Sequence, residues 1–312
     1  MRVLIIGATG LLGRDLCARL AECHDLTGWA RRTPTAASPE VRRMESVEIA
    51  DREAVLHAMG RVHPDAVIHT AAMSDVDACE RDPASACHIN VVGTENIALG
   101  CRQTGAFLMA ISTDYVFDGA LSRPYQERDP AHPISVYGQS KWDGEQEALN
   151  TAPRCLIVRV SGLFGAGRPN FVTGTIENFK AGRPVRVVTD QTNSPSYTVD
   201  LAEGISRLLE MSERTPQETE SGQQLHGPLH LANAGGASRL DVARTIARHL
   251  GASESLIEKT TWAALNRPAR RPANSVLDCS RFVAVGGVAL RPWHEALKEF
   301  LHSGILDQSL FP

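Results

Sequence analysis

A tyrosine and a lysine four residues apart are the residues whose types and spacing best suggest chemistry. They are Tyr137 and Lys141, in the segment Ser-Val-Tyr-Gly-Gln-Ser-Lys that ends at 141. Residues with this spacing lie on one face of a helix, one turn apart. A free phenol has a pKa near ~10, and a neighbouring ammonium favours the phenolate. We therefore expect a pair that hands a proton to a carbonyl oxygen.

Chance alone accounts poorly for this pair. The chain has only four Tyr and four Lys among its 312 residues, so a Tyr-x-x-x-Lys arises by chance ~0.05 times. Whether the pair is functional depends on the elements that would position it.

The N-terminus reads as a buried strand, a glycine-rich turn and a helix. Residues 3–6 are Val-Leu-Ile-Ile, and residues 7–13 are Gly-Ala-Thr-Gly-Leu-Leu-Gly. Three glycines with this spacing let backbone amides at a helix N-terminus approach a pyrophosphate closely. The turn predicts a dinucleotide site, with contacts from the residues Gly7, Thr9, Gly10, Leu11, Leu12 and Gly13.

Two arginines follow the second expected strand, at residues 25–29. Dinucleotide folds selective for NAD usually place an acidic residue here to bind the ribose 2′-hydroxyl. Arg31 and Arg32 instead suit a 2′-phosphate, although a solvated charge pair is the alternative. The sequence favours NADP(H) over NAD(H).

Further cofactor contacts are expected where the next strands end. Residues 47–51 are expected to form the third strand, and Asp51 at its exit is included among the cofactor contacts. Residues 66–69 form a short buried strand that ends at His69, for which a structural role is favoured over catalysis. The small residues Ala71 and Ala72 after it would let the cofactor lie flat across the carboxyl edge of the sheet.

The strand expected at 107–111 runs into Ser-Thr-Asp-Tyr-Val-Phe at 112–117. Polar groups at the carboxyl end of a central strand lie beside the cofactor in a doubly wound sheet. Thr113 can donate to a substrate oxygen, and Asp114 can accept from a sugar hydroxyl, with Tyr115 beside them. A turn or a helix cap is the alternative for the hydroxyls.

Strand and helix alternate up to about residue 160, which predicts a Rossmann-type, doubly wound parallel α/β sheet. After that the pattern changes to loops and short strands, and we expect a smaller C-terminal α+β lobe. The dinucleotide-binding domain is predicted to comprise residues 1–160 and about 196–232. The substrate-binding lobe is predicted to comprise about 161–195 and 233–312.

Composition is that of a cytoplasmic globular protein. Hydrophobic residues make up 43% and charged residues 22% of the chain. A net charge of −4 gives no reason to expect nucleic acid or an anionic membrane, and no apolar run reaches the ~20 residues of a membrane helix. Seven scattered cysteines without a Cys-x-x-Cys pair predict free thiols, mostly buried, in a reducing compartment, and no metal site is expected.

Taken in order, four motifs resemble those of the extended short-chain dehydrogenase/reductases, most of all the dTDP-4-dehydrorhamnose reductase family. They are the glycine turn at 7–13, the 112–117 segment, the Tyr137/Lys141 pair and Arg-Pro-Ala-Asn-Ser at 271–275. The resemblance runs from residue 1 to about 300. It implies catalytic roles for Thr113, Tyr137 and Lys141, with Lys141 holding the nicotinamide ribose and lowering the Tyr137 pKa.

The same resemblance implies NADPH-dependent reduction of the C4 keto group of a nucleotide-linked 4-keto-6-deoxy sugar. Arg271 and Asn274 would lie near the phosphates of that ligand, and a surface charge pair of residues 270 and 271 is the alternative. Asn170 and Phe171 are further candidates for the substrate site. A homodimer is an open expectation.

One position departs from the family pattern. Gly162 stands where many of the rhamnose enzymes place a tryptophan near the sugar, so we expect open space there and a pocket that accepts a larger sugar. The chain also resembles a non-catalytic, NADP-binding regulatory subunit of S-adenosylmethionine synthetase. That subunit commonly has serine at the position of Thr113, which favours the enzymes. A reductase or epimerase of another nucleotide sugar is the third alternative.

Overall fold

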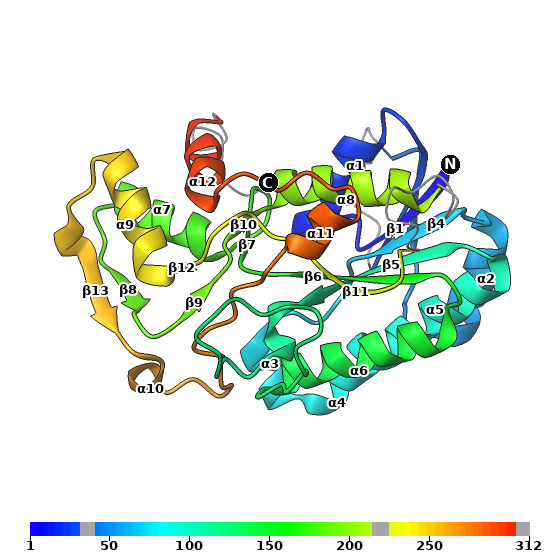
Figure 1. The fold of residues 1–312 in the computed structure, drawn as a ribbon, viewed down its shortest axis with the longest axis horizontal. Helices are drawn as coiled ribbons and strands as arrows, with labels where there is room; N and C mark the ends of the chain where they lie inside the picture. Colours follow the sequence, from blue (N-terminus) through cyan, green and yellow to red (C-terminus); the bar gives the residue numbers. More distant parts are fainter. Residues whose placement is uncertain (32–40, 214–224, 304–312) are drawn as a thin grey trace.

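A seven-stranded parallel sheet forms the centre of the computed structural model, which describes residues 1–31, 41–213 and 225–303 (Figure 1). Its strand order is β11-β6-β5-β4-β1-β2-β3, and every neighbouring pair is parallel. The strands are β1 (Arg2–Ile6), β2 (Asp25–Ala30), β3 (Arg43–Ser46), β4 (Ala66–His69), β5 (Phe107–Thr113), β6 (Cys155–Val160) and β11 (Gly227–His230). The predicted Rossmann-type sheet is confirmed.

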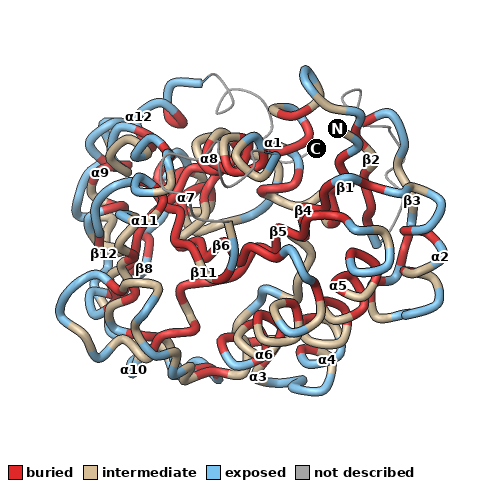
Figure 2. Tube along the Cα trace, turned by 45° about the vertical axis from the view of Figure 1, so that its right-hand side comes forward, coloured by how far each residue is buried: buried red, intermediate tan, exposed pale blue. Residues whose placement is uncertain are grey.

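Alternating side chains of the central strands fill two separate cores. In β1, Val3 and Ile5 point into one core and Leu4 and Ile6 into the other, as the two-residue period of a strand requires. Figure 2 shows β4, β5, β6 and β11 as nearly continuous buried segments. Strands buried on both faces read as unbroken apolar runs, which is why the sequence identified them.

Helices cover both faces of the sheet. One face carries α1 (Leu11–Leu20), α8 (Thr198–Ser212) and α11 (Ser280–Ala284), and α1 packs against α8. The other carries α2 (Arg52–Val62), α5 (Gly93–Thr104) and α6 (Val136–Thr151), and the short elements α3 (Val76–Arg81), α4 (Pro83–Cys87) and η1 (His88–Val92) lie beside α6. The π-helical turn η1 connects α4 directly to α5.

Elements from the second half of the chain form a third apolar core beside the sheet (Figure 1). They are β7 (Leu163–Phe164), α7 (Phe171–Lys180), β8 (Val185–Val188), β9 (Thr192–Asn193), β10 (Ser196–Tyr197), β12 (Ala237–Ser238), α9 (Arg239–Leu250), η3 (Glu254–Leu256), β13 (Ile257–Thr260), α10 (Trp262–Leu265) and α12 (Trp293–His302). β8 pairs with β13, β7 with β10, and β9 with β12.

The structure refines the local predictions at the third strand and at the cysteines. The third strand lies at Arg43–Ser46, not at 47–51, because Ile49 packs into the second core and its carbonyl accepts a hydrogen bond from the Asn96 side chain. None of the seven cysteines forms a disulfide, and most are buried as expected, whereas Cys23 and Cys87 are exposed. The polar stretch at residues 214–224 of the sequence lies outside the described residues.

Candidate active site

The glycine turn between β1 and α1 has the shape that a close approach of a pyrophosphate requires. Gly7 has φ +87°, and a β-carbon there would lie 2.5 Å from Thr70 Oγ1. A β-carbon on Gly13 would lie 2.1 Å from the Gly7 carbonyl oxygen. Since α1 begins at Leu11 with no side-chain cap, its first amides face the turn. These residues fit a dinucleotide phosphate.

The other expected cofactor residues surround this turn. Thr9 and Leu12 belong to the turn and to the first turn of α1, and Ala71 and Ala72 follow β4, with the Ala71 amide beside Gly7. Asp51 is exposed and caps α2, where its carboxylate accepts the Ala54 amide hydrogen.

Arg31 follows β2 directly and is exposed, so its guanidinium is available at the edge where a 2′-phosphate is expected. Arg32 lies outside the described residues. Their roles and that of Asp51 remain predictions.

Thr113 and Tyr137 meet at the carboxyl end of β5. Thr113 is the last residue of the strand, and its hydroxyl lies close enough to the Tyr137 phenol to act to lower the Tyr137 pKa. Burial has the larger effect and raises that pKa. The Tyr137 pKa is therefore raised overall, because desolvation of the phenolate outweighs the Thr113 contact, and the lowering expected from Lys141 remains a prediction.

Lys141 lies one turn further along α6 and is buried. Its ammonium group donates to the Ile111 carbonyl at 2.9 Å, so β5 supplies both the threonine and the anchor of the lysine. Burial lowers the Lys141 pKa to about 8, and the Glu145 carboxylate one turn beyond opposes this shift. The structure thus brings together all three predicted catalytic residues at one strand end.

Two glycines let α6 sit close to its neighbours. A β-carbon on Gly138 would lie 2.2 Å from the Tyr115 carbonyl oxygen, and one on Gly144 would lie 2.4 Å from the Asn90 carbonyl oxygen. The close approach brings the backbone of Tyr137 against the segment after β5.

Behind Lys141, an ion pair that the sequence analysis missed supports the same helix. Glu145 and Arg159 are each 2% exposed in their side chains, and Arg159 Nη2 donates to Glu145 Oε2 at 2.7 Å. Ser112 Oγ also donates to Glu145, at 2.5 Å. An arginine inside the apolar run of β6 was the available signal, since a buried charge needs a partner.

Asp114 is buried within a set of hydroxyl groups. Ser161 and Ser275 donate to its Oδ2 at 2.8 and 2.5 Å, and Thr113 donates to its Oδ1 at 3.2 Å. Burial raises the Asp114 pKa to about 6 against these hydrogen bonds. The carboxylate joins β5 to the segments after β6 and before residue 276, and its contact with a sugar remains a prediction.

Tyr115 lies beside Tyr137, with the two rings edge-on at a centroid distance of 5.8 Å. Its hydroxyl accepts from Gln191 Nε2 at 3.1 Å, and Gln191 Oε1 accepts from Arg239 Nε at 3.3 Å. This chain of contacts links the catalytic phenol to α9, a connection that spacing alone could not show.

Arg271 and Asn274 face this region from the segment before residue 276. Arg271 is ion-paired with Asp77 at 2.7 Å, stacks on Trp262 and holds the pKa of the Asp77 carboxyl well below its usual range. Asn274 donates to the Leu121 carbonyl at 2.7 Å. Both side chains hold loop segments in place through these contacts, and their contact with ligand phosphates remains a prediction.

Asn170 and Phe171 stand at the start of α7. Asn170 caps the helix through a reciprocal capping box with Thr173. The Phe171 ring lies under the Arg239 guanidinium, 4.4 Å from its centroid. Thus Phe171 belongs to the Tyr115 contact chain, whereas Asn170 serves the backbone.

The open space expected at Gly162 is absent. A β-carbon there would lie 2.9 Å from Asn193 Nδ2 and 3.0 Å from the Ser194 carbonyl oxygen, and φ is +57°. The expectation of a pocket at this atom is wrong because the 193–195 segment fills the position.

We expect Gly162→Ala to destabilise the protein by more than about 1 kcal/mol, since alanine is strained at positive φ and the backbone neighbours cannot yield. Urea unfolding followed by circular dichroism measures this. Gly60→Ala is the control, because Gly60 lies in the helix α2 with nothing near its added β-carbon and should stabilise by up to ~1 kcal/mol.

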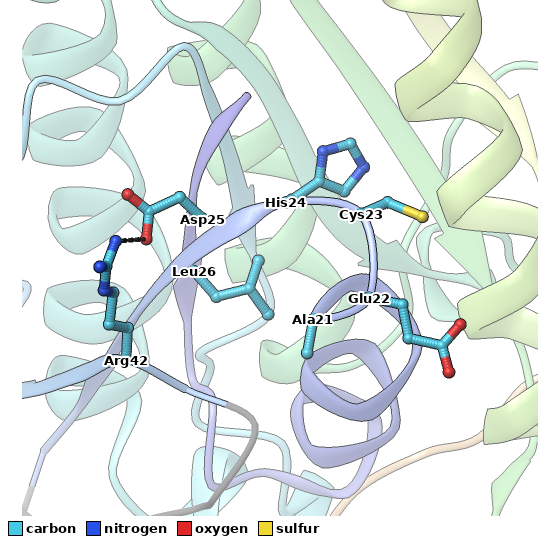
Figure 3. A pocket seen from close by; sticks show the side chains of 7 residues that line it. All are labelled: Ala21, Glu22, Cys23, His24, Asp25, Leu26 and Arg42. Carbon is cyan, nitrogen blue, oxygen red and sulfur yellow. Dashed lines mark hydrogen bonds and ion pairs between the residues drawn. The ribbon is translucent and has the colours of Figure 1, made fainter.

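A surface hollow of about 480 Å³ lies elsewhere (Figure 3). It is lined by residues 21–26 and by Arg42, whose guanidinium is 3.5 Å from Asp25. Asp25 begins β2, so this hollow lies at the amino ends of the strands, away from the carboxyl edge where ligands of such sheets bind. It is not a candidate for the site.

The described ranges contain neither a metal-ligand cluster nor a membrane-spanning helix. No cluster of three or more His, Cys, Asp or Glu side chains there could hold a metal ion. Within the same ranges, no helix combines the length and the apolar character needed to cross a bilayer.

A glycine turn after β1 and a Thr–Tyr–Lys group at the end of β5, on a parallel seven-stranded sheet, define an extended short-chain dehydrogenase/reductase. Within that class, the chain belongs to the family described as "RmlD substrate binding domain", whose model matches residues 1–305. The resemblance inferred from the motifs is confirmed.

Relatives of the chain are similar over nearly their whole length. A dTDP-4-dehydrorhamnose reductase of Streptomyces griseus is 39% identical, over 96% of this chain and 92% of the relative. A probable dTDP-4,6-dihydroxy-2-methyloxan-3-one 4-ketoreductase of Streptomyces antibioticus is 37% identical, over 96% and 94%. The crystal structure of a Bacillus anthracis dTDP-4-dehydrorhamnose reductase with NADP superposes with a TM-score of 0.85 at 29% identity, covering 97% of this chain and 99% of that one.

Proposed function

We propose that this protein is an NADPH-dependent reductase of the C4 keto group of a nucleotide-linked 4-keto-6-deoxy sugar. The observation that carries the proposal is the meeting of Thr113, Tyr137 and Lys141 at the end of β5. The names of the relatives support the substrate class, and the NADP in the Bacillus anthracis structure supports the cofactor.

Each of the three residues has a distinct task in this reaction. NADPH, when bound, supplies the hydride. Tyr137 gives its proton to the keto oxygen, and Thr113 donates a hydrogen bond to that oxygen as negative charge develops there. Lys141, anchored by the Ile111 carbonyl, presents an ammonium group to the nicotinamide ribose beside the phenol. Burial raises the Tyr137 pKa, and the Thr113 hydroxyl opposes this shift.

The direct test is NADPH oxidation, followed at 340 nm, with dTDP-4-keto-6-deoxyhexose and with other 4-keto sugar nucleotides. We expect turnover with at least one of them and a product reduced at C4. A protein that binds NADP but oxidises no NADPH with any of them would instead support the non-catalytic regulatory alternative.

The substrate lobe, the assembly and the location belong to the same proposal. In this proposal the elements around the third core form the substrate lobe, and the contact chain from Phe171 through Arg239, Gln191 and Tyr115 supports their link to Tyr137. We place the enzyme in the cytoplasm as a homodimer. Light scattering would measure its mass in solution.

Removing the arginines after β2 should erase the preference for NADPH. We expect the wild-type protein to bind NADPH more tightly than NADH by about 1.5–3 kcal/mol, the value of a charge-assisted hydrogen bond. The double variant Arg31→Ala, Arg32→Ala should bind both equally in fluorescence titrations. Arg42→Ala, which removes an exposed arginine paired with Asp25, is the control and should keep the preference.

The rate should also fall at high pH because Lys141 loses its charge. Its pKa is lowered to about 8, so the ammonium is present below this pH and lost above it. We expect kcat/KM for NADPH, which reports groups of the free enzyme, to decline from about pH 8. A profile that stays flat to pH 10 would contradict this role.

A further inference from the structure

Arg239 is the first residue of α9. A ring contact and a hydrogen bond hold its guanidinium group, which has no ion pair among the described residues. Its group lies over the Phe171 ring at 4.4 Å, and its Nε makes one long hydrogen bond, 3.3 Å, to Gln191 Oε1. In the part of the chain that the structure describes, no carboxylate forms an ion pair with it. The side chain is only partly exposed, and burial lowers the Arg239 pKa.

Other inward-facing arginines are paired. Arg159 has Glu145 at 2.7 Å, Arg271 has Asp77 at 2.7 Å, and Arg291 has Asp200 at 2.7 Å. A charged group that is partly removed from water is costly without a partner. The unpaired Arg239 is therefore a candidate for binding an anionic group of a ligand.

The position of Arg239 identifies that anion. Through Gln191 and Tyr115, the guanidinium is two side chains away from the ring of the catalytic Tyr137. Arg271 is close enough to act on it as a like charge. Among the described residues, Asp77 is ion-paired with Arg271 and Arg267, and Asp114 acts on Arg239 without an ion pair, so three guanidinium groups face two carboxylates here.

We propose that Arg239 binds the phosphate that carries the sugar in the nucleotide-linked substrate. This inference rests on the proposed function, which makes that substrate a nucleoside diphosphate sugar. Arginine presents a planar fork that matches phosphate oxygens, and the stack on Phe171 fixes the plane of the fork in advance. The Gln191–Tyr115 contacts then couple phosphate binding to the position of the sugar beside Tyr137.

Calorimetric titration with dTDP and dTMP, each in the presence of NADP⁺, tests the contact without requiring turnover. dTDP has the phosphate that would carry the sugar, and dTMP lacks it. For Arg239→Gln we expect dTDP affinity to fall roughly 10- to 100-fold and dTMP affinity to stay unchanged. Arg239→Lys, which keeps the charge but not the fork, should fall between the two proteins. Arg186→Gln, on the exposed arginine of β8, should bind dTDP like the wild type.

Each outcome decides between the claims. Equal dTDP affinity in wild type and Arg239→Gln, or an equal loss for dTDP and dTMP, overturns the role of Arg239 and leaves the proposed function intact. A wild-type protein that binds neither nucleotide and reduces no 4-keto sugar nucleotide overturns both. If Arg239→Gln fails to fold, judged by thermal unfolding and NADP⁺ binding, the dTDP-to-dTMP ratio of Arg239→Lys decides by itself.

Discussion

Replacing Tyr137 by phenylalanine should lower kcat by about 10²- to 10⁴-fold while NADPH still binds. The change removes the proton donor and almost no volume. Thr113 would keep its place at the end of β5, so its hydroxyl would still contact the keto oxygen and leave some residual rate. Stopped-flow measurement of NADPH oxidation gives the rate, and fluorescence titration gives the affinity for the cofactor.

A matched control for this variant is Tyr197→Phe. Tyr197 packs against Phe164 in the third core. Removing its hydroxyl therefore tests for general damage and leaves the proposed proton donor, Tyr137, unchanged. Its rate should remain within about twofold of wild type, as expected for a change remote from the chemistry. Near-normal turnover in Tyr137→Phe would show that another group donates the proton.

Glu145→Gln should cost about 3–5 kcal/mol in the free energy of unfolding, the penalty for leaving a buried charge without its partner. Arg159 would keep its guanidinium inside β6 but lose the carboxylate that accepts from Nε and Nη2. Urea denaturation followed by tryptophan fluorescence and by circular dichroism should give coincident, earlier transitions.

Two further variants separate the ion pair from the helix that carries it. Glu147→Gln changes another glutamate of α6 that has no ion pair among the described residues, and should alter stability by less than about 0.5 kcal/mol. Replacing both Glu145 and Arg159 by methionine should recover most of the loss, because no charge is then stranded. A single variant as stable as wild type would mean that water solvates Arg159.

Much of this architecture could be predicted because single residues report it locally. Glycines at 7 and 13 indicate a close backbone approach, and buried parallel strands such as 107–111 read as unbroken apolar runs. The helix α6 could be placed because Tyr137 and Lys141 share a face, and in the structure Thr113 lies beside Tyr137.

The remainder depends on contacts between segments far apart in the chain. The prediction of a strand at 47–51 is wrong. Ile49 follows the alternation of a strand in the sequence, but in the structure it packs against Gly93 of α5. The space at Gly162 is filled by residues 193–195, and Arg239 meets Gln191 across 48 positions. No periodicity in the sequence predicts such contacts.

The two glycines of the catalytic helix have a consequence for anyone who wishes to redesign this enzyme. Since a β-carbon at Gly138 or Gly144 would overlap a backbone oxygen, at Tyr115 or Asn90, a larger residue at either position would push α6 away from its neighbours. Variation is better directed at side chains of the adjoining lobe other than Phe171 and Arg239, which form the proposed phosphate contact. New sugar preferences should then be sought with the scaffold of α6 held constant.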